Sequence, residues 1–197
     1  MQFKTFEPNI EVLGQAMYSM IEGFGAFKGV AIKYLVAHGI CEKKDNELLL
    51  DPAQWYSLDQ WLQAFEKISR DLGDTSLFLT GKCIPINAKF PTWVKDVESA
   101  VKSIDIAFHM NHRKNGIDMF NPATGTMLEG IGHYGFEKIA DKKVIISVCN
   151  TPYPCEFDRG IITAMANKFE LRATVVHDNT KPCRKNGQDS CTYIINY

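Results

Sequence analysis

The sequence lacks any apolar run long enough to span a bilayer, and its first residues lack the apolar segment of a secretory signal peptide. It also lacks a charge bias, because the formal net charge is -1 and neither sign of charge forms a long run. No global electrostatic field therefore draws the protein to nucleic acid or to an anionic membrane. We expect a cytoplasmic protein that binds neither.

The common catalytic signatures are missing as well. The sequence contains no glycine-rich phosphate loop, no serine nucleophile elbow and no His-Glu-x-x-His run. Their absence favours a binding domain over an enzyme and leaves the question of enzymatic activity open.

Length and composition are those of an ordinary globular domain. The chain has 197 residues, of which 45% are hydrophobic and 11% aromatic. A core of this size needs no disulfide bonds, and cytoplasmic thiols stay reduced. The six cysteines therefore indicate metal binding, redox chemistry or simple burial.

Helical spacing of apolar residues characterises the first half of the chain. It predicts helices over residues 9–27, 30–38, 51–73 and 93–112, with a further helix or turn over 75–86. Pro52 suits the first position of its helix, and Gly39 suits the end of another.

After Arg113 the pattern changes to turn dipeptides and β-branched runs. It predicts strands over residues 127–139, 142–149, 171–177 and 189–197, and a helix over 154–169. This indicates an α+β fold in which a helical N-terminal half packs on a C-terminal antiparallel sheet of order β-β-α-β-β. We divide the chain into a helical part, residues 1–92, and an α+β part, residues 93–197, which together form one compact domain.

Cysteines gather at the ends of the last predicted elements. Cys155 lies at a helix N-terminus, where the helix dipole and amide donors favour the thiolate. Cys183 and Cys191 flank a polar turn, and His177 ends the preceding strand. Four such ligands suit tetrahedral zinc.

Other interpretations of these residues remain open. The Cys-x7-Cys spacing is not that of a zinc finger, and the fourth ligand could be His177, Asp178 or Cys149. The thiols could be inert. Alternatively, Cys149 and Cys155 could form the redox pair of a thiol-dependent, reductase-like enzyme with His133 as the acid.

Three histidines form a second group of candidates. His109 and His112 lie three residues apart on a predicted helix and share a face, so they could bind one metal, or one could reach an iron porphyrin. Alternatively, His112 and Arg113 could simply be favourable charges at a helix C-terminus. His133 lies in a glycine-rich stretch that could form either a pocket wall or a bulge.

The C-terminal layout resembles the 4-vinyl reductase domain family, which shares its fold with trafficking-particle subunits and, more distantly, with haem nitric oxide/oxygen-binding domains. The resemblance covers about residues 94–197 and is one of layout. It implies zinc held by Cys155, Cys183 and Cys191. Where the family has a glutamate, this chain offers His177 or Asp178.

The haem-binding relatives imply a further test. Their iron ligand is a histidine on the helix before the sheet, a place that His109 or His112 could fill. Their propionates are held by a Tyr-x-Ser-x-Arg run, but residues 149–153 of this chain contain no arginine. Haem is therefore our second cofactor, after zinc.

Together these observations predict a sensory or regulatory domain that binds a small hydrophobic or aromatic ligand between the helical half and the sheet. We expect a structural zinc site, a homodimer and a signalling partner protein. The alternatives are a haem-binding gas sensor, the thiol-dependent enzyme, or a purely structural interaction module. The residues predicted to line the ligand pocket are Trp93, Phe108, His109, Met119, Phe120 and His133.

Overall fold

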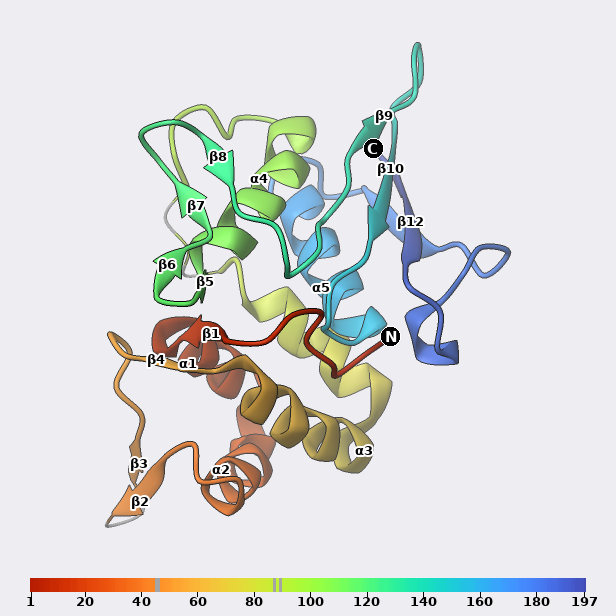
Figure 1. Cartoon of the computed structure of the whole chain (residues 1–197). Coiled ribbons are helices and arrows are strands. Elements are labelled where there is room, and N and C mark those ends of the chain that lie inside the picture. The colour runs from red at the N-terminus through yellow and green to blue at the C-terminus, as the bar shows by residue number, and fades with distance from the viewer. Residues whose placement is uncertain (45–46, 87, 89) are drawn as a thin grey trace.

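The computed structural model describes residues 1–44, 47–86, 88 and 90–197. Figure 1 shows α1, α2 and α3 in one half of the molecule, and α4, α5 and the last strands in the other. The helices are α1 (Gly14–Gly23), α2 (Lys28–Ala37), α3 (Leu58–Cys83), α4 (Val97–Met110) and α5 (Cys155–Asn167), with short 3-10 turns η1 (Gly25–Phe27) and η2 (Arg184–Asn186). No helix in this part of the chain is long and apolar enough to cross a membrane.

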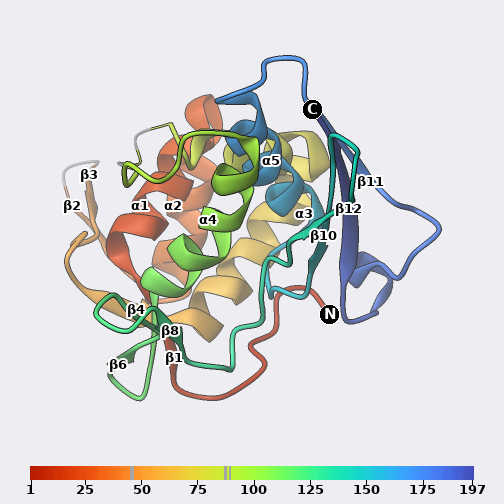
Figure 2. The ribbon, with the colours of Figure 1, turned by 90° about the horizontal axis from the view of Figure 1, so that it is seen from above.

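A four-stranded antiparallel sheet forms one side of the C-terminal half. Its spatial order is β11 (Thr174–His177), β12 (Cys191–Asn196), β10 (Val144–Cys149) and β9 (Glu137–Lys138). In Figure 2 the helices lie together on one face of this sheet, and α5 connects β10 to β11. The chain order β9-β10-α5-β11-β12 confirms the predicted β-β-α-β-β arrangement and the α+β class.

A second four-stranded sheet was not predicted. Its order is β4 (Trp55–Ser57), β1 (Ile10–Leu13), β5 (His112–Lys114) and β6 (Ile117–Asp118). The predicted helices therefore start too early at residues 9 and 51, and the one predicted to end at 112 runs too far. Ile10 and Val12 are buried at a period of two, which is the period of a strand.

Local geometry sets the boundaries of the long helices. α3 begins after Ser57, whose hydroxyl accepts a hydrogen bond from the backbone N–H of Gln60. It breaks at Gly73, where φ is 72°, and then resumes. The predicted end at Gly73 and the further helix after residue 75 are therefore both confirmed. α4 begins after Asp96, not after Thr92 as predicted, because Asp96 and Ser99 form a capping box.

The predicted strand over residues 127–139 is wrong along most of its length. β8 (Thr126–Met127) pairs with β7 (Phe120–Asn121), and β9 begins only at Glu137. Gly130 and Gly132, between them, have φ values of 131° and 77°, which a regular strand does not adopt. A further short pair consists of β2 (Glu42–Lys44) and β3 (Glu47–Leu49).

Two glycines allow α3 and α5 to approach closely. A Cβ on Gly81 would lie 2.1 Å from the carbonyl oxygen of Phe157, and one on Gly160 would lie 2.2 Å from that of Phe78. The first turns of α5 are thereby held against the N-terminal half. Cys155 and the buried residues that follow it are positioned by this contact.

Candidate functional site

Three cysteine sulfurs form a single cluster at the N-terminus of α5. Cys155 is the first residue of α5, Cys191 is the first of β12, and Cys183 directly precedes η2. The Sγ atoms of Cys155 and Cys191 are 3.1 Å apart, those of Cys155 and Cys183 3.6 Å, and those of Cys183 and Cys191 3.9 Å. Sulfurs that share a tetrahedral zinc with bonds of about 2.3 Å lie roughly 3.8 Å apart. The structure therefore brings together the three cysteines of the predicted metal site with spacings close to those that zinc needs.

The cluster also favours the charge state that binds metals. A hydrogen bond from the Cys155 thiol, together with the nearby charge of Arg184, lowers the pKa of Cys191 to about 4. The backbone N–H of Arg184 donates to the Cys191 sulfur over 3.3 Å. The same thiol–thiolate hydrogen bond raises the pKa of Cys155. One thiolate is therefore stable here, and the thiolate is the form that ligates metals.

The predicted fourth ligands lie outside this close group. His177 borders the same polar cavity of about 390 Å³ as Cys155 and Cys183, and its Nε2 is buried without a hydrogen-bond partner. The Asp178 carboxylate instead accepts hydrogen bonds from Thr180. Within the described residues, the sulfurs gather as a group of three that does not include His177.

Cys149 is placed differently from the clustered thiols. It lies on β10 directly opposite Cys191 in the strand pairing, and it is completely buried. Burial raises the pKa of its thiol far above the usual range, and its sulfur contacts the Ser147 hydroxyl at 3.4 Å. This environment disfavours the thiolate that the thiol-dependent enzyme alternative requires.

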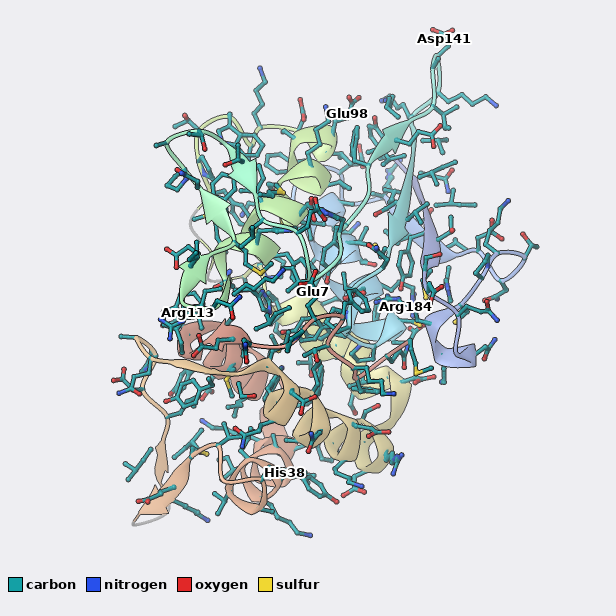
Figure 3. All side chains as sticks on the ribbon, viewed as in Figure 1. Glu7, His38, Glu98, Arg113, Asp141 and Arg184 are labelled. Atoms are coloured by element: carbon teal, nitrogen blue, oxygen red, sulfur yellow. The ribbon has the colours of Figure 1, made fainter. Side chains whose placement is uncertain are left out.

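A buried network ties the cysteine cluster to the rest of the C-terminal half. Arg184, which Figure 3 places between α5 and the last segment of the chain, donates from Nη2 to Asp158 Oδ2 over 2.6 Å. Its Nη1 donates to the carbonyl oxygens of Thr151 and Tyr153. Asp158 also accepts hydrogen bonds from the hydroxyls of Tyr134 and Thr151.

Sequence analysis missed this ion pair, although one signal pointed to it. Asp158 lies beside Phe157 and shares its helix face with the apolar Ile161 and Ile162, and an acidic residue on an apolar face is rarely buried without a cation. Its partner could not be named from the sequence, because Arg184 lies 26 residues further on and meets Asp158 only through packing.

An apolar cavity of about 120 Å³ forms a second candidate site, between α1, α4 and α5. Its size is close to that of an engineered cavity of about 150 Å³ that binds benzene. Six aromatic or histidine residues contribute to its walls. The lining residues include Ala16, Met20, Phe90, Ile104, Phe108, His112, Tyr134, Tyr153, Phe157, Ile161 and Met165.

One polar pair faces this cavity. His112 Nδ1 lies 2.7 Å from the carbonyl oxygen of Phe108, which fixes the proton on Nδ1. Its Nε2 therefore accepts a hydrogen bond from the Tyr153 hydroxyl, 3.1 Å away. Burial lowers the pKa of His112 to about 4, so the imidazole is neutral at physiological pH.

The predicted pocket residues are dispersed in the structure. Phe108 lines the cavity, whereas Trp93 is 44% exposed and Met119 is fully buried elsewhere. Phe120 pairs with Met127 in the β7–β8 ladder.

His109 and His133, the other two predicted pocket residues, pack against each other with ring centroids 4.8 Å apart. Neither is among the residues that line the cavity. The lining residues Tyr153 and Phe157 were missed, because their contribution depends on how α5 crosses α4.

No protein-family model matches the sequence. A search of curated proteins finds no match either. Solved structures do match. A triple variant of an H-NOX protein from S. oneidensis in the Fe(II) state is 17% identical with a TM-score of 0.60, over 93% of this chain and 95% of that one.

Two further H-NOX structures match to a similar extent. An Fe(II) unliganded H-NOX protein from K. algicida is 14% identical with a TM-score of 0.60, over 93% of this chain and 95% of that one. A structure from a study of haem distortion in the H-NOX family is 14% identical with a TM-score of 0.64, over 93% and 94%. The predicted relation to the haem nitric oxide/oxygen-binding domains is therefore confirmed at the level of the fold, which this chain shares with H-NOX proteins over nearly its whole length.

Proposed function

We propose that this chain is a sensory domain that binds a small apolar or aromatic molecule in the cavity between α1, α4 and α5. The observation that supports this proposal is the cavity itself. Its walls are almost entirely apolar, and the neutral pair of His112 and Tyr153 can orient a ligand through one polar group. The H-NOX fold supports the sensory class.

A ligand there can influence the cysteine cluster through the buried network. Tyr153 lines the cavity with its ring, and its carbonyl oxygen accepts a hydrogen bond from Arg184. Arg184 in turn directly follows Cys183 in the chain. A ligand that binds better to one position of Tyr153 than to another therefore shifts the population of the C-terminal segment, which a signalling partner protein can detect.

The cysteine cluster supports a structural zinc ion as the second part of this proposal. We expect protein purified under reducing conditions, without added metal, to contain about one zinc per chain by elemental analysis. Cys191→Ser should retain less than about a tenth of that amount, because it removes the thiolate of the cluster. Cys83→Ser is the matched control, since Cys83 is a free thiol outside the group, and it should keep its zinc. Zinc-free wild-type protein would contradict the assignment.

Haem is a second candidate, favoured by the comparison with H-NOX proteins. His112 lines the cavity and the carbonyl oxygen of Phe108 orients its ring, as for an axial ligand, but its Nε2 would have to give up the hydrogen bond from the Tyr153 hydroxyl. The volume of the cavity and the charges around it do not fit a haem. The cavity measures about 120 Å³, no lysine or arginine lines it among the residues that the structure describes, and the nearby Arg184 is already paired with Asp158. We therefore place the smaller ligand first.

One titration separates the two candidates. Toluene at about ten times its Kd should raise the Tm of the wild-type protein by about 3–6 °C. Ile104→Phe should abolish this shift, because Ile104 lines the cavity and a larger ring fills it. Ile106→Phe, two residues along α4 and not among the lining residues, is the matched control and should preserve the shift.

The second arm adds hemin to the same protein and follows the absorption spectrum. We expect no saturable Soret band. A one-to-one Soret band that disappears in His112→Ala would establish haem as the occupant and overturn the small-ligand proposal.

A further inference from the structure

A second group of potential metal ligands lies away from both the cavity and the cysteine cluster. Asp105 and His109 are one turn apart on α4 and share a face, and His133 approaches them from the loop that precedes β9. One ligand atom from each residue lies within 4.8 Å of the other two. The two histidines and the carboxylate come from segments that are 24 or more residues apart in the chain, so only the tertiary structure brings them together.

The loop is fixed to α4 by this group. His133 Nδ1 lies 3.0 Å from Asp105 Oδ2, and the backbone N–H of Tyr134 donates to Asp105 Oδ1 over 2.9 Å. On its other side, His133 Nε2 lies 3.1 Å from Glu129 Oε2. Two imidazoles and the Asp105 carboxylate therefore converge on one place, while Glu129 lies at the opposite ring nitrogen of His133.

One ring nitrogen of His109 has no hydrogen-bond partner. His109 is completely buried, and its Nδ1 lies 2.8 Å from the carbonyl oxygen of Asp105. Its Nε2 is buried without a partner. The His109 ring lies against that of His133, with centroids 4.8 Å apart. A buried polar atom without a partner costs about 1–3 kcal/mol, and native proteins rarely leave one unsatisfied.

The orientation of His109 is the one that metal-ligating histidines adopt. Their second ring nitrogen usually donates to a backbone carbonyl or a carboxylate, which fixes the ring and leaves the other nitrogen free to bind. Two imidazole nitrogens with carboxylate oxygens are a donor set for divalent transition metals such as zinc or iron(II). A tetrahedral zinc with bonds of about 2.0–2.1 Å requires ligand atoms roughly 3.4 Å apart. The group must therefore tighten by an ångström or so, which a loop side chain such as His133 can accommodate.

We propose that Asp105, His109 and His133 bind a divalent transition-metal ion. The ion joins α4 to the loop that carries Tyr134, and Tyr134 lines the apolar cavity. The rival interpretation is a metal-free ion pair, in which a protonated His133 bridges Asp105 and Glu129 and leaves His109 without a role.

Cobalt(II) distinguishes these interpretations, because its absorption reports the ligand type. The full chain is first given about one equivalent of zinc to fill the cysteine cluster, whose thiolates bind zinc more tightly than imidazole and carboxylate groups do, and is then desalted and titrated with cobalt(II). We expect about one equivalent to bind, with d–d bands and no thiolate charge-transfer band. His109→Gln and His133→Gln should each weaken this binding by tenfold or more. His38→Gln, which alters the histidine directly after α2, in the other half of the molecule from α4 in Figure 1, should leave it unchanged.

Folding of each variant is checked by circular dichroism, and the half-exposed His133 provides a variant that is not expected to disturb the core. Absence of cobalt binding to the wild-type protein would overturn the proposal, as would binding that persists in His133→Gln. Binding accompanied only by a thiolate band would overturn it too, because cobalt would then be in the cysteine cluster. The titration contains no cavity ligand, so its outcome is independent of the toluene experiment.

Discussion

Replacing Arg184 by methionine should lower the free energy of unfolding by about 3–5 kcal/mol. Both partners of the Arg184–Asp158 ion pair are completely shielded from solvent, with Nη2 and Oδ2 2.6 Å apart. Methionine fills much of the volume but leaves the Asp158 carboxylate in an apolar interior without a cation. It also leaves the carbonyl oxygens of Thr151 and Tyr153 without their donor. Urea unfolding followed by circular dichroism measures the change.

Two further variants make this test specific. Lys185→Met removes the neighbouring cation, whose partner Asp74 is largely exposed, and should cost less than about 1 kcal/mol. In Arg184→Met/Asp158→Leu no uncompensated charge remains, so the double variant should recover part of the loss of the single one. A loss below about 1 kcal/mol in Arg184→Met would show that the pair is not buried as described.

Acidification should destabilise the protein through His112 by about 3 kcal/mol between pH 7 and pH 4. Burial lowers the pKa of this residue from 6.5 to about 4 in the folded state. The unfolded chain therefore takes up a proton at a higher pH than the folded chain does. The stability contribution of the neutral imidazole is complete above pH 6.5, falls as the pH decreases toward 4, and changes no further below that value.

Comparison with His112→Gln isolates this contribution. The free energy of unfolding is measured in urea at half-unit steps of pH for both proteins, without haem. Carboxylates and the cysteine cluster also respond to acid, but they are common to both proteins and cancel in the difference. We expect the stability of the wild-type protein to fall more steeply between pH 6.5 and pH 4. Parallel curves would show that His112 is protonated in the folded protein or is accessible to water.

Elements with a strong local signal were predicted well from the sequence. The helix beginning beside Pro154, the hairpin through Asp141 and the break at Gly73 all depend on residues close together in the chain. Strands β1 and β4 were taken for helix, because each is only three or four residues long and is stabilised by hydrogen bonds to distant segments. Such pairing leaves little trace in a short window of sequence.

What the sequence by itself determined is the α+β class and the gathering of Cys155, Cys183 and Cys191, since all three occupy the ends of recognisable elements. The tertiary structure alone decided the partners: Arg184 for Asp158, Tyr153 for His112, and Asp105 for His133. Each of these pairs joins residues 26 to 41 positions apart. The physical reason is that a buried polar side chain takes as its partner whichever group the packing of helices and strands brings within hydrogen-bond distance, and that packing is a property of the whole fold.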